Sequence, residues 1–491
     1  MHRIAIALMF VAAGCTPKQP ITMASVPPPP PEEMVRAASQ TTAPPQAAAG
    51  ALAATITERT IRAHMEFLAS DALNGRGSGT RDEWIAATYI ASQFRAWGLE
   101  PMGDAGGYVQ TIEMGFTEAV APALTAGALT FVHGRDMLAT PGTSLQVSGP
   151  LHKVEPGKPA PAGSVALVPA GATLEPAMTA SAAVVLTAET PQVRARWDAT
   201  AARPLRLTQP RAVKLAASPA AAAPAPRPAR IVLSAGAASA IAALPAGTPV
   251  SFTAESKPGQ TYTWNTVGKL TGTDPALSSE VIVLSAHLDH IGARPPQPGT
   301  DTINNGADDD ASGTVAVMAL AEALSKAPRP RRTIVFALFG SEESGGYGAG
   351  FFVDLPVVPL DRLVADLQFE MLGRPDPKIP PNHLWLTGYE RSNLGAELAK
   401  QGAALVADPH PDQSFFTRSD NIRFARRGVV AHTVSSYNLH KEYHTVADEI
   451  GMIDFPYMTA SIKSLVEPIR WLANGAFKPT WNPGGCPAPC K

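Results

Sequence analysis

The alternation of apolar strands and amphipathic helices from residue 262 onward is the feature that most constrains the fold. Residues 281–285, Val-Ile-Val-Leu-Ser, form an apolar run without polar alternation, which is typical of a strand covered on both faces. Similar patterns predict further strands at 333–339, 363–369 and 428–435, and helices at 311–325 and 455–474. A chain ordered in this way is expected to form an α/β fold with a mostly parallel central sheet flanked by helices.

Side chains able to bind a metal follow the predicted strands. They are His287, Glu342, Glu343, Glu370 and, in the loop after the last strand, His444. Open α/β sheets bind ligands outside the carboxyl ends of their strands, so these five side chains are expected to meet at one edge of the sheet. Imidazoles and carboxylates in these proportions suit a pair of zinc ions.

The segment 305–313, Asn-Gly-Ala-Asp-Asp-Asp-Ala-Ser-Gly, supplies a residue that both ions can share. Two cations about 3.5–4 Å apart repel each other unless a group such as a carboxylate binds both. Asp309, the middle aspartate, lies in a glycine-flanked turn directly before a helix and is our candidate for this bridge. Read alone, three successive aspartates are more typical of a solvated loop in which one caps a helix, and the surrounding ligand motifs reverse that interpretation.

With Asp309 as the bridge, His287 and Glu370 complete one zinc site, and Glu343 and His444 complete the other. Two Zn²⁺ ions balance the charge of three carboxylates and a bound hydroxide. The expected site is therefore neutral and can be partly buried without a large uncompensated charge.

Two aspartates are assigned supporting roles. Asp289 lies two positions after His287 on the same strand, faces the same side, and is expected to accept the second ring N–H of His287. Asp448, four positions after His444, is placed to do the same for that histidine or to cap the following turn.

Other neighbours of the ligands are not expected to bind metal. Glu342 and Glu343 are adjacent, so their side chains cannot both face the same ion after a strand, and Glu342 is left free as a general base. Zinc lowers the pKa of its water to about 7, so a nearby carboxylate need only complete the deprotonation. His290 and His440 are interpreted as ordinary loop histidines, because the ligand set is already complete.

In combination, the motifs His-x-Asp, Gly-x-Asp-Asp-Asp-Ala-Ser-Gly, Glu-Glu and Tyr-His-Thr resemble those of metallopeptidase family 28 (clan MH), the co-catalytic zinc aminopeptidases. The resemblance extends over about residues 57–125 and 250–475. It implies the zinc-exopeptidase fold, two zinc ions per chain, Glu342 as general base and Asp289 as supporting acid.

The same resemblance implies how the ligands are shared between the ions. It places His287, Asp309 and Glu370 on one zinc, and Asp309, Glu343 and His444 on the other. It also implies a cis peptide bond between Asp309 and Asp310.

The resemblance predicts an aminopeptidase that hydrolyses the N-terminal peptide bond of peptides, with a hydroxide held between the ions as nucleophile. The main alternative is a carboxypeptidase or dipeptidase of the same fold, which would bind the other end of the substrate. The candidates for lining such a pocket are Phe415, Phe416 and Tyr437, and apolar residues at these positions are equally typical of the core. A C-terminal carboxylate requires a basic clamp. The nearest candidates in the sequence, all outside the ligand motifs, are Arg294, Arg374 and Arg418.

Two further classes remain as alternatives. Some proteins of this fold have lost their ligands and act as receptors, but the complete ligand set argues against that class. A single-zinc glutaminyl cyclase is also known on this fold, and the Glu-Glu pair with a full bridge argues for peptide hydrolysis instead. The 40 basic and 42 acidic residues include no long basic run, so peptides rather than nucleic acids are the expected partners. The sequence does not specify an oligomeric state.

The first 50 residues predict export and a membrane anchor. Residues 1–14 combine a short basic start, an apolar stretch and small residues, which is typical of a signal peptide. Cys15 then resembles the lipidated cysteine of bacterial lipoproteins, and residues 15–50 form a Pro/Ala-rich linker. We expect a lipoprotein at the periplasmic face of the outer membrane, with plain secretion as the alternative.

The remaining chain divides into further segments. Residues 51–124 predict two helices that belong to the peptidase domain, which continues over 256–475. Between them, 125–255 predicts a small β-rich domain with an Ala/Pro-rich loop, which resembles a protease-associated insert in position. In the C-terminal tail, 476–491, Cys486 and Cys490 are placed to form a disulfide.

Overall fold

The computed structural model describes residues 51–487, except for positions 141, 143, 173–175, 204 and 216–226. The predicted signal peptide, Cys15 and the linker lie outside the described residues. Cys486 is disulfide-bonded, whereas Cys490, its predicted partner, lies outside the described part of the chain.

Four parallel strands form the centre of the main sheet, in the order β13, β12, β14, β17. Their bounds are Val281–His287 for β12, Thr333–Phe339 for β13, Leu363–Phe369 for β14 and Ala431–Ser435 for β17. The long strand β11 (Pro249–Leu270) is antiparallel to β13, and β15 (Leu384–Leu386) is antiparallel to β17. Two short strands, β1 (Glu100–Pro101) beside β11 and β16 (Leu405–Ala407) beside β15, complete the edges. The predicted α/β fold with a mostly parallel sheet is confirmed.

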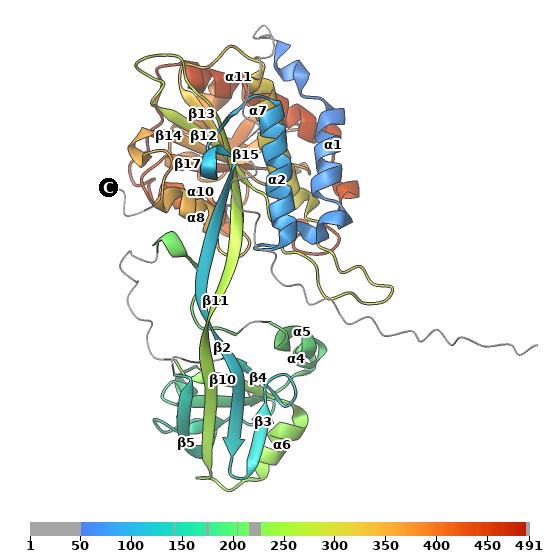
Figure 1. The fold of residues 1–491 in the computed structure, drawn as a ribbon, viewed down its shortest axis with the longest axis vertical. Coiled ribbons are helices and arrows are strands. Elements are labelled where there is room, and N and C mark those ends of the chain that lie inside the picture. Colours follow the sequence, from blue (N-terminus) through green and yellow to red (C-terminus); the bar gives the residue numbers. More distant parts are fainter. Residues whose placement is uncertain are drawn as a thin grey trace, which may run out of the picture.

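Helices cover both faces of this sheet, as Figure 1 shows. One side carries α1 (Glu58–Leu68), α2 (Arg81–Ala96), α7 (Gly313–Ser325) and α11 (Phe455–Asn474). The other side carries α8 (Tyr347–Asp354) and α10 (Asn421–Ala425), while α9 (Leu394–Lys400) packs beside β16 and α11. The helices predicted at 311–325 and 455–474 are therefore present, and so are two helices between 57 and 100.

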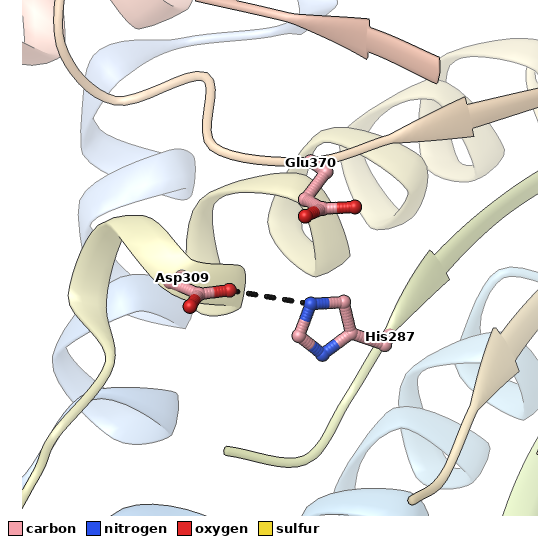
Figure 2. Close-up of side chains that lie close together, drawn as sticks. All are labelled: His287, Asp309 and Glu370. Carbon is pink, nitrogen blue, oxygen red and sulfur yellow. Dashed lines mark ion pairs between the residues drawn. The ribbon is translucent and has the colours of Figure 1, made fainter. Parts of the chain in front are cut away.

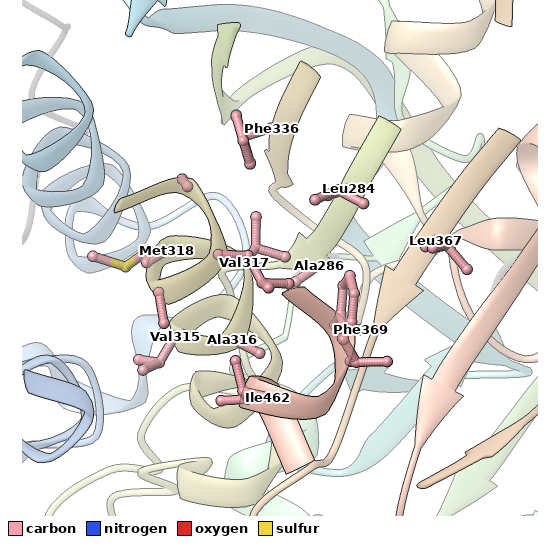
Figure 3. Close-up of a cluster of buried hydrophobic side chains, with 14 of the residues drawn as sticks. Leu284, Ala286, Val315, Ala316, Val317, Met318, Phe336, Leu367, Phe369 and Ile462 are labelled. Atoms are coloured by element: carbon pink, nitrogen blue, oxygen red, sulfur yellow. The ribbon is translucent and has the colours of Figure 1, made fainter. Parts of the chain in front are cut away.

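The pattern of β12 explains why it is buried on both sides. Ile282, Leu284 and Ala286 belong to the core shared with α1, α2, α7 and α11, whereas Val281 and Val283 face the core shared with α8 and α10. Successive side chains of a strand point to opposite faces, so an uninterrupted apolar run fills two cores at once. Figure 3 shows part of the first core, where Val317 of α7 lies beside Ala286 of β12 and Phe369 of β14.

A second, smaller unit stands apart from the main sheet (Figure 1). The strands β2 (Val109–Ala126) and β11 pair along their length as a long antiparallel ribbon, and the intervening residues form this unit at its far end. Its strands are β3 (Leu129–Val132), β4 (Met137–Thr140), β5 (Gln146–Lys153), β6 (Val165–Leu167), β7 (Val184–Ala188), β8 (Leu205–Arg206), β9 (Arg211–Ala212) and β10 (Ala229–Leu233). Its helices are α3 (Pro176–Thr179), α4 (Pro191–Ala195), α5 (Trp197–Ala201) and α6 (Ala235–Ala243). The unit has an apolar core of its own.

Within residues 51–487, apart from the gaps given above, no helix is both long and apolar enough to cross a bilayer.

Candidate metal centre

Three predicted ligands meet at the carboxyl edge of the sheet. His287 ends β12, Glu370 follows β14 directly, and Asp309 lies in the short π-helical segment Ala307–Ser312 that precedes α7. One ligand atom from each lies within 4.8 Å of the others. Figure 2 shows the three side chains facing one another, with 3.3 Å between His287 Nε2 and Asp309 Oδ1. Such a group can hold one metal ion.

The second predicted pair lies on the other side of Asp309. His444 Nε2 is 3.0 Å from Asp309 Oδ2 and 3.1 Å from Glu343 Oε2. The two oxygens of Asp309 therefore face different groups, Oδ1 toward His287 and Oδ2 toward His444. This is the arrangement that a carboxylate needs to bridge two cations.

His290 is also part of this second group, which the sequence analysis did not anticipate. Its side chain is fully buried, and its Nδ1 lies 2.9 Å from Glu343 Oε1 and 3.8 Å from Asp309 Oδ2. The interpretation of His290 as an ordinary loop histidine is therefore wrong. The available signal was its spacing, because in His-Leu-Asp-His it follows a ligand by only three positions.

His440, the other histidine interpreted as a loop residue, contacts an aspartate beside the bridge. Its Nε2 is 3.1 Å from Asp308 Oδ2, and its Nδ1 is 3.6 Å from Glu442 Oε2. It belongs to neither ligand group.

The donor atoms of the site fit a metal because they lack other partners. Buried polar atoms in folded proteins are almost always hydrogen-bonded, so a cluster of unbonded ones calls for an explanation. Here the buried side-chain atoms without a hydrogen-bond partner include Asp309 Oδ2, Glu343 Oε1, Glu370 Oε2, His444 Nε2 and both ring nitrogens of His290. Carboxylate oxygens and imidazole nitrogens are ligands that zinc accepts, so two adjacent cations would satisfy these atoms together.

The pKa shifts of the site also favour bound cations. Burial raises the pKa of Glu370 to about 7 and raises the pKa of Glu342 well above its ordinary value. Burial lowers the pKa of His444, but the adjacent carboxylates of Asp309 and Glu343 raise it more, to about 10. Carboxylates crowded together in a desolvated site favour a positive charge between them. Divalent cations would supply that charge.

Hydrogen bonds to the backbone hold the bridging aspartate in place. Asp448 Oδ1 and Oδ2 accept from the amides of Asp308 and Asp309 at 2.9 and 3.0 Å. Asp310 accepts from the amides of His287 and Met371 at 3.2 and 3.1 Å. The Asp309–Asp310 peptide bond is cis, as the family resemblance implies.

The supporting aspartates make contacts other than those expected. Nδ1 of His287 lies 3.2 Å from the backbone oxygen of Asp289 and 3.6 Å from its carboxylate, so the carbonyl is the closer acceptor. The carboxylate of Asp289 instead accepts from the Ser78 hydroxyl and, at 3.0 Å, from the amide of Glu342. Asp448 likewise binds backbone amides rather than His444. The spacing of residues in the sequence cannot predict a hydrogen bond to a backbone amide that is close in space but far along the chain.

A buried carboxylate from α2 supports the segment before Glu342. Glu83 Oε1 accepts from the amide of Ser341 at 2.7 Å and from the Thr263 hydroxyl at 2.8 Å, while its Oε2 accepts from the amide of Gly79 at 2.7 Å. Ser341 has a left-handed backbone, with φ of 53°, and the next residue is Glu342. Together, Glu83 and Asp289 fix the backbone position of residues 341 and 342. Glu83 could not be identified from the sequence, because it lies 259 positions before Glu342 in an ordinary amphipathic helix.

A small pocket of about 30 Å³ adjoins Glu370. Phe415, Trp385 and Tyr437 line it together with Tyr443, whose ring stacks on His444 at 3.9 Å. Of the predicted pocket residues, Phe415 and Tyr437 do line this pocket, whereas Phe416 belongs to the core on the α8 side of the sheet.

One of the three basic residues considered as a carboxylate clamp lies at this pocket. Arg418 is among its lining residues, 5.0 Å above the Phe415 ring. Arg374 instead pairs with Glu442 at 3.1 Å. Arg294 lies in an exposed loop, where its amide bonds to the Thr302 carbonyl.

The fold is that of the zinc aminopeptidases. An aminopeptidase from Aneurinibacillus sp. strain AM-1 superposes with a TM-score of 0.53 at 17% identity, over 87% of this chain and 97% of that one. A zinc aminopeptidase from Bacillus subtilis gives a TM-score of 0.51 at 17% identity, over 86% and 96%.

The sequence matches agree with this class. Residues 265–466, about two fifths of the chain, match the model of Peptidase family M28. Leucine aminopeptidase 2 from Trichophyton equinum is 29% identical over 178 residues, which cover 34% of this chain and 32% of that protein. The match thus spans about a third of the length of the curated relatives. The segment that carries the candidate metal centre is therefore similar to the M28 peptidases, and the fold is shared with zinc aminopeptidases.

Proposed function

We propose that the protein is a two-zinc aminopeptidase that hydrolyses the first peptide bond of peptides with a free N-terminus. The observation that carries this proposal is the arrangement around Asp309, whose two oxygens face two separate groups of buried, unpartnered nitrogen and oxygen atoms. His287 and Glu370 would hold one ion, and Glu343 and His444 the other. When bound, two such ions would polarise the scissile carbonyl and lower the pKa of a water molecule between them.

The residues of the chain would divide the remaining work. The backbone amide of Glu342 donates to the Asp289 carboxylate and so positions the residue. The Glu342 carboxylate would take a proton from the attacking water and pass it to the leaving amine. The C–N bond of the substrate would break as the new C–O bond forms, so water is the only co-reactant. Tyr443 and Trp385 would enclose the first side chain of the substrate in the pocket beside Glu370.

The acidic site favours the N-terminus of a substrate over its C-terminus. Bound cations would offset the charges of Glu370 and Glu343, whereas Glu342, which is not assigned to an ion, would remain as a buried carboxylate that a substrate ammonium group can face. This argument supports the aminopeptidase assignment.

Arg418 supports a second candidate, a carboxypeptidase or dipeptidase of the same fold. Its guanidinium lines the same pocket, and a planar guanidinium can bind a carboxylate with two parallel hydrogen bonds. In that case the pocket would hold the C-terminal residue of the substrate.

Peptides blocked at one end distinguish the two candidates. Purified, zinc-loaded protein would be incubated with one peptide in three forms: both ends free, N-acetylated, and C-terminally amidated. The proposal expects release of the first residue from the free and amidated forms, and no reaction with the acetylated form. Cleavage of the acetylated form from its C-terminal end, with the amidated form untouched, would establish the alternative. Metal analysis of the same sample is expected to give two ions per chain.

We also propose that the protein acts outside the cytoplasm, anchored through Cys15. The support is the signal-like segment 1–14, the cysteine that follows it and the Pro/Ala-rich linker. Cell fractionation of the wild type and of Cys15→Ser tests the anchor, since only the variant should leave the membrane fraction. A wild type that is wholly soluble would contradict the anchor and leave export open.

A further inference from the structure

The pocket beside Glu370 is small for a site that receives a substrate side chain. Its volume is about 30 Å³, whereas pockets for drug-sized ligands measure roughly 300–1,000 Å³. A cavity needs about 10–15 Å³ to hold one water molecule. The pocket therefore has room for the few atoms of a short side chain and not for a long aliphatic or aromatic one.

Aromatic rings form much of the wall of this pocket. Trp385 and Phe415 stack with their ring centroids 5.4 Å apart, and Tyr437 meets Phe415 edge to face at 5.7 Å. The Tyr437 ring lies 5.2 Å from the ring of Tyr443, which stacks on His444. These rings thus form one continuous row that ends at a candidate zinc ligand.

His410 holds the other end of the row. Its buried ring meets the rings of Trp385 and Phe415 edge to face, with centroids 6.4 and 6.1 Å away. His410 Nε2 lies 2.7 Å from Asp376 Oδ2, and His410 Nδ1 lies 3.2 Å from Lys378 Nζ. Close-packed side chains yield little to an added group, so a substrate side chain cannot easily push this row aside.

The lining of the pocket also includes short polar side chains, those of Thr387, Ser419, Thr433 and Ser435. The indole N–H of Trp385 is buried and has no hydrogen-bond partner within the described residues. A hydroxyl group on the substrate side chain is therefore acceptable in this pocket. Serine belongs with alanine to the class of side chains that fit.

We infer that the protein prefers substrates whose first side chain is short, of the alanine and serine class, and that Trp385 and Phe415 set this limit. The inference rests on the proposed function, because it assigns the first side chain of the substrate to this pocket. One extra methylene in an apolar pocket changes discrimination by about tenfold to two-hundredfold. Leucine and phenylalanine exceed alanine by more than one such group, so they are expected to react at least about tenfold more slowly.

Hydrolysis of aminoacyl p-nitroanilides by the purified, zinc-loaded protein tests this preference. The kcat/KM values are expected to be highest for the alanine and serine anilides, about tenfold lower or more for leucine, and lowest for phenylalanine. A value for leucine or phenylalanine that equals or exceeds the value for alanine would overturn the inference.

Phe415→Ala removes one wall of the pocket. The ratio of kcat/KM for leucine to kcat/KM for alanine should rise by about tenfold or more in this variant. Phe416→Ala is the matched control, because Phe416 is also buried but belongs to the core on the α8 side of the sheet. Its ratio should equal that of the wild type. A ratio measured on one sample does not depend on the fraction of active protein, so partial unfolding cannot imitate the effect.

Thermal unfolding establishes that each variant is folded. If Phe415→Ala does not fold, Phe415→Leu takes its place, since it removes the ring but keeps an apolar side chain, and the ratio should rise in the same direction. An unchanged ratio in a folded Phe415 variant would overturn the assignment of this wall to substrate selection.

Binding of L-alaninamide and L-leucinamide, measured by titration calorimetry, separates failure of the inference from failure of the proposed function. If the leucine anilide is hydrolysed fastest, the proposed function stands and the size limit fails. If no anilide is hydrolysed, the proposed function fails, and the calorimetry decides the size limit. Tighter binding of L-alaninamide would support the limit, whereas equal or tighter binding of L-leucinamide would overturn it.

Discussion

Glu342 and Glu343 are adjacent, but their surroundings give them different tasks. The Glu343 carboxylate faces His290 and His444 and belongs to the second ligand group, whereas Glu342 belongs to neither group and is anchored through its amide to Asp289. The first carboxylate of the pair is thus available for proton transfer, and the second for holding an ion.

Glu342→Gln is expected to retain both metals and the fold while turnover falls by roughly a hundredfold to ten-thousandfold, the usual effect of losing a general base. Glu343→Gln is expected to lower the metal content instead, because it removes a charged ligand. Metal analysis and steady-state kinetics on the two variants check this. The reverse pattern, with metal lost only in Glu342→Gln, would exchange the two roles.

His290 is expected to contribute to binding of the second ion. His290→Ala should weaken binding of one metal by about tenfold to a hundredfold, the range found when groups that orient or supplement the ligands are removed. Metal retained after dialysis and the visible spectrum of the cobalt-substituted protein report this without any activity assay. His383→Ala is the control, because the ring of His383 lies in a loop and bonds only to the Pro381 carbonyl among the contacts described. Wild-type metal content and an unchanged cobalt spectrum in His290→Ala would leave this histidine with a packing role.

Glu83 is expected to position the general base. Glu83→Ala leaves the buried Ser341 amide unpaired, so Glu342 should shift and kcat should fall by about tenfold to a hundredfold with metal content and KM little changed. Glu83→Gln keeps an oxygen for Ser341 and should lose less. If Glu83→Ala has the wild-type kcat, or loses activity only in proportion to lost metal, the positioning role is refuted.

The ligands could be predicted from the sequence because each lies next to a recognisable strand or turn. Strand ends gather at one edge of a parallel sheet, so chain position alone brings His287 and Glu370 together. The contacts of Asp289 with the Glu342 amide and of Glu83 with the Ser341 amide could not be predicted. The first depends on the pairing of β12 with β13, and the second on the packing of α2 against the sheet. The contacts of His290 could not be predicted either, because five other residues already complete two zinc sites and only the fold brings its ring to Glu343.

At the scale of single elements, strands and helices with strong patterns were the most predictable. The first four residues of β12, 281–284, are all apolar because each face of the strand meets a separate core, so the run shows neither polar alternation nor a helical period. The antiparallel edges formed by β11 and β15 were not predicted, because pairing direction depends on the connection between strands rather than on their composition.

Strand β17 contains a histidine whose burial makes stability depend on pH. The ring of His432 is fully buried, with Nδ1 2.7 Å from the Thr387 carbonyl and Nε2 2.7 Å from the Ser392 hydroxyl. A carbonyl can only accept, so Nδ1 carries a proton, and in the neutral ring Nε2 accepts from the Ser392 hydroxyl. Burial lowers the pKa of His432 to about 4.

The unfolded chain binds this proton at a higher pH than the folded protein, so His432 stabilises the fold fully above about pH 6.5 and loses that contribution as the pH falls toward 4. Between pH 7 and pH 5 the free energy of unfolding should fall by about 2 kcal/mol through this residue. Urea unfolding of the wild type and His432→Gln at both pH values isolates the contribution, because other groups titrate in both proteins. An equal pH dependence in the two would show that His432 does not titrate in this way.

At the scale of the whole molecule, the chain consists of a catalytic part and a smaller unit, each with its own core. The family match covers only 265–466, so it omits α2, which carries Glu83, and the entire smaller unit. The ribbon of β2 and β11 joins the two parts, and the cluster of Met114, Ala212 and Phe351 links the returning segment to α8. The sequence indicated a β-rich segment between the peptidase portions, but no local pattern indicated that its connecting strands would extend it away from the sheet.

The register of the ribbon allows the smaller unit to be removed cleanly. Ala126 pairs with Val250 across the ribbon, so replacing residues 127–249 by Asn-Gly should close a two-residue hairpin without disturbing the strands. Since the catalytic part keeps its own core, the shortened protein should fold, bind metal and turn over amidated peptides within about tenfold of the wild-type rate. Metal analysis, thermal unfolding and kinetics on an amidated peptide test this, and loss of metal or of folding would show that the smaller unit is part of the fold that holds the metal centre.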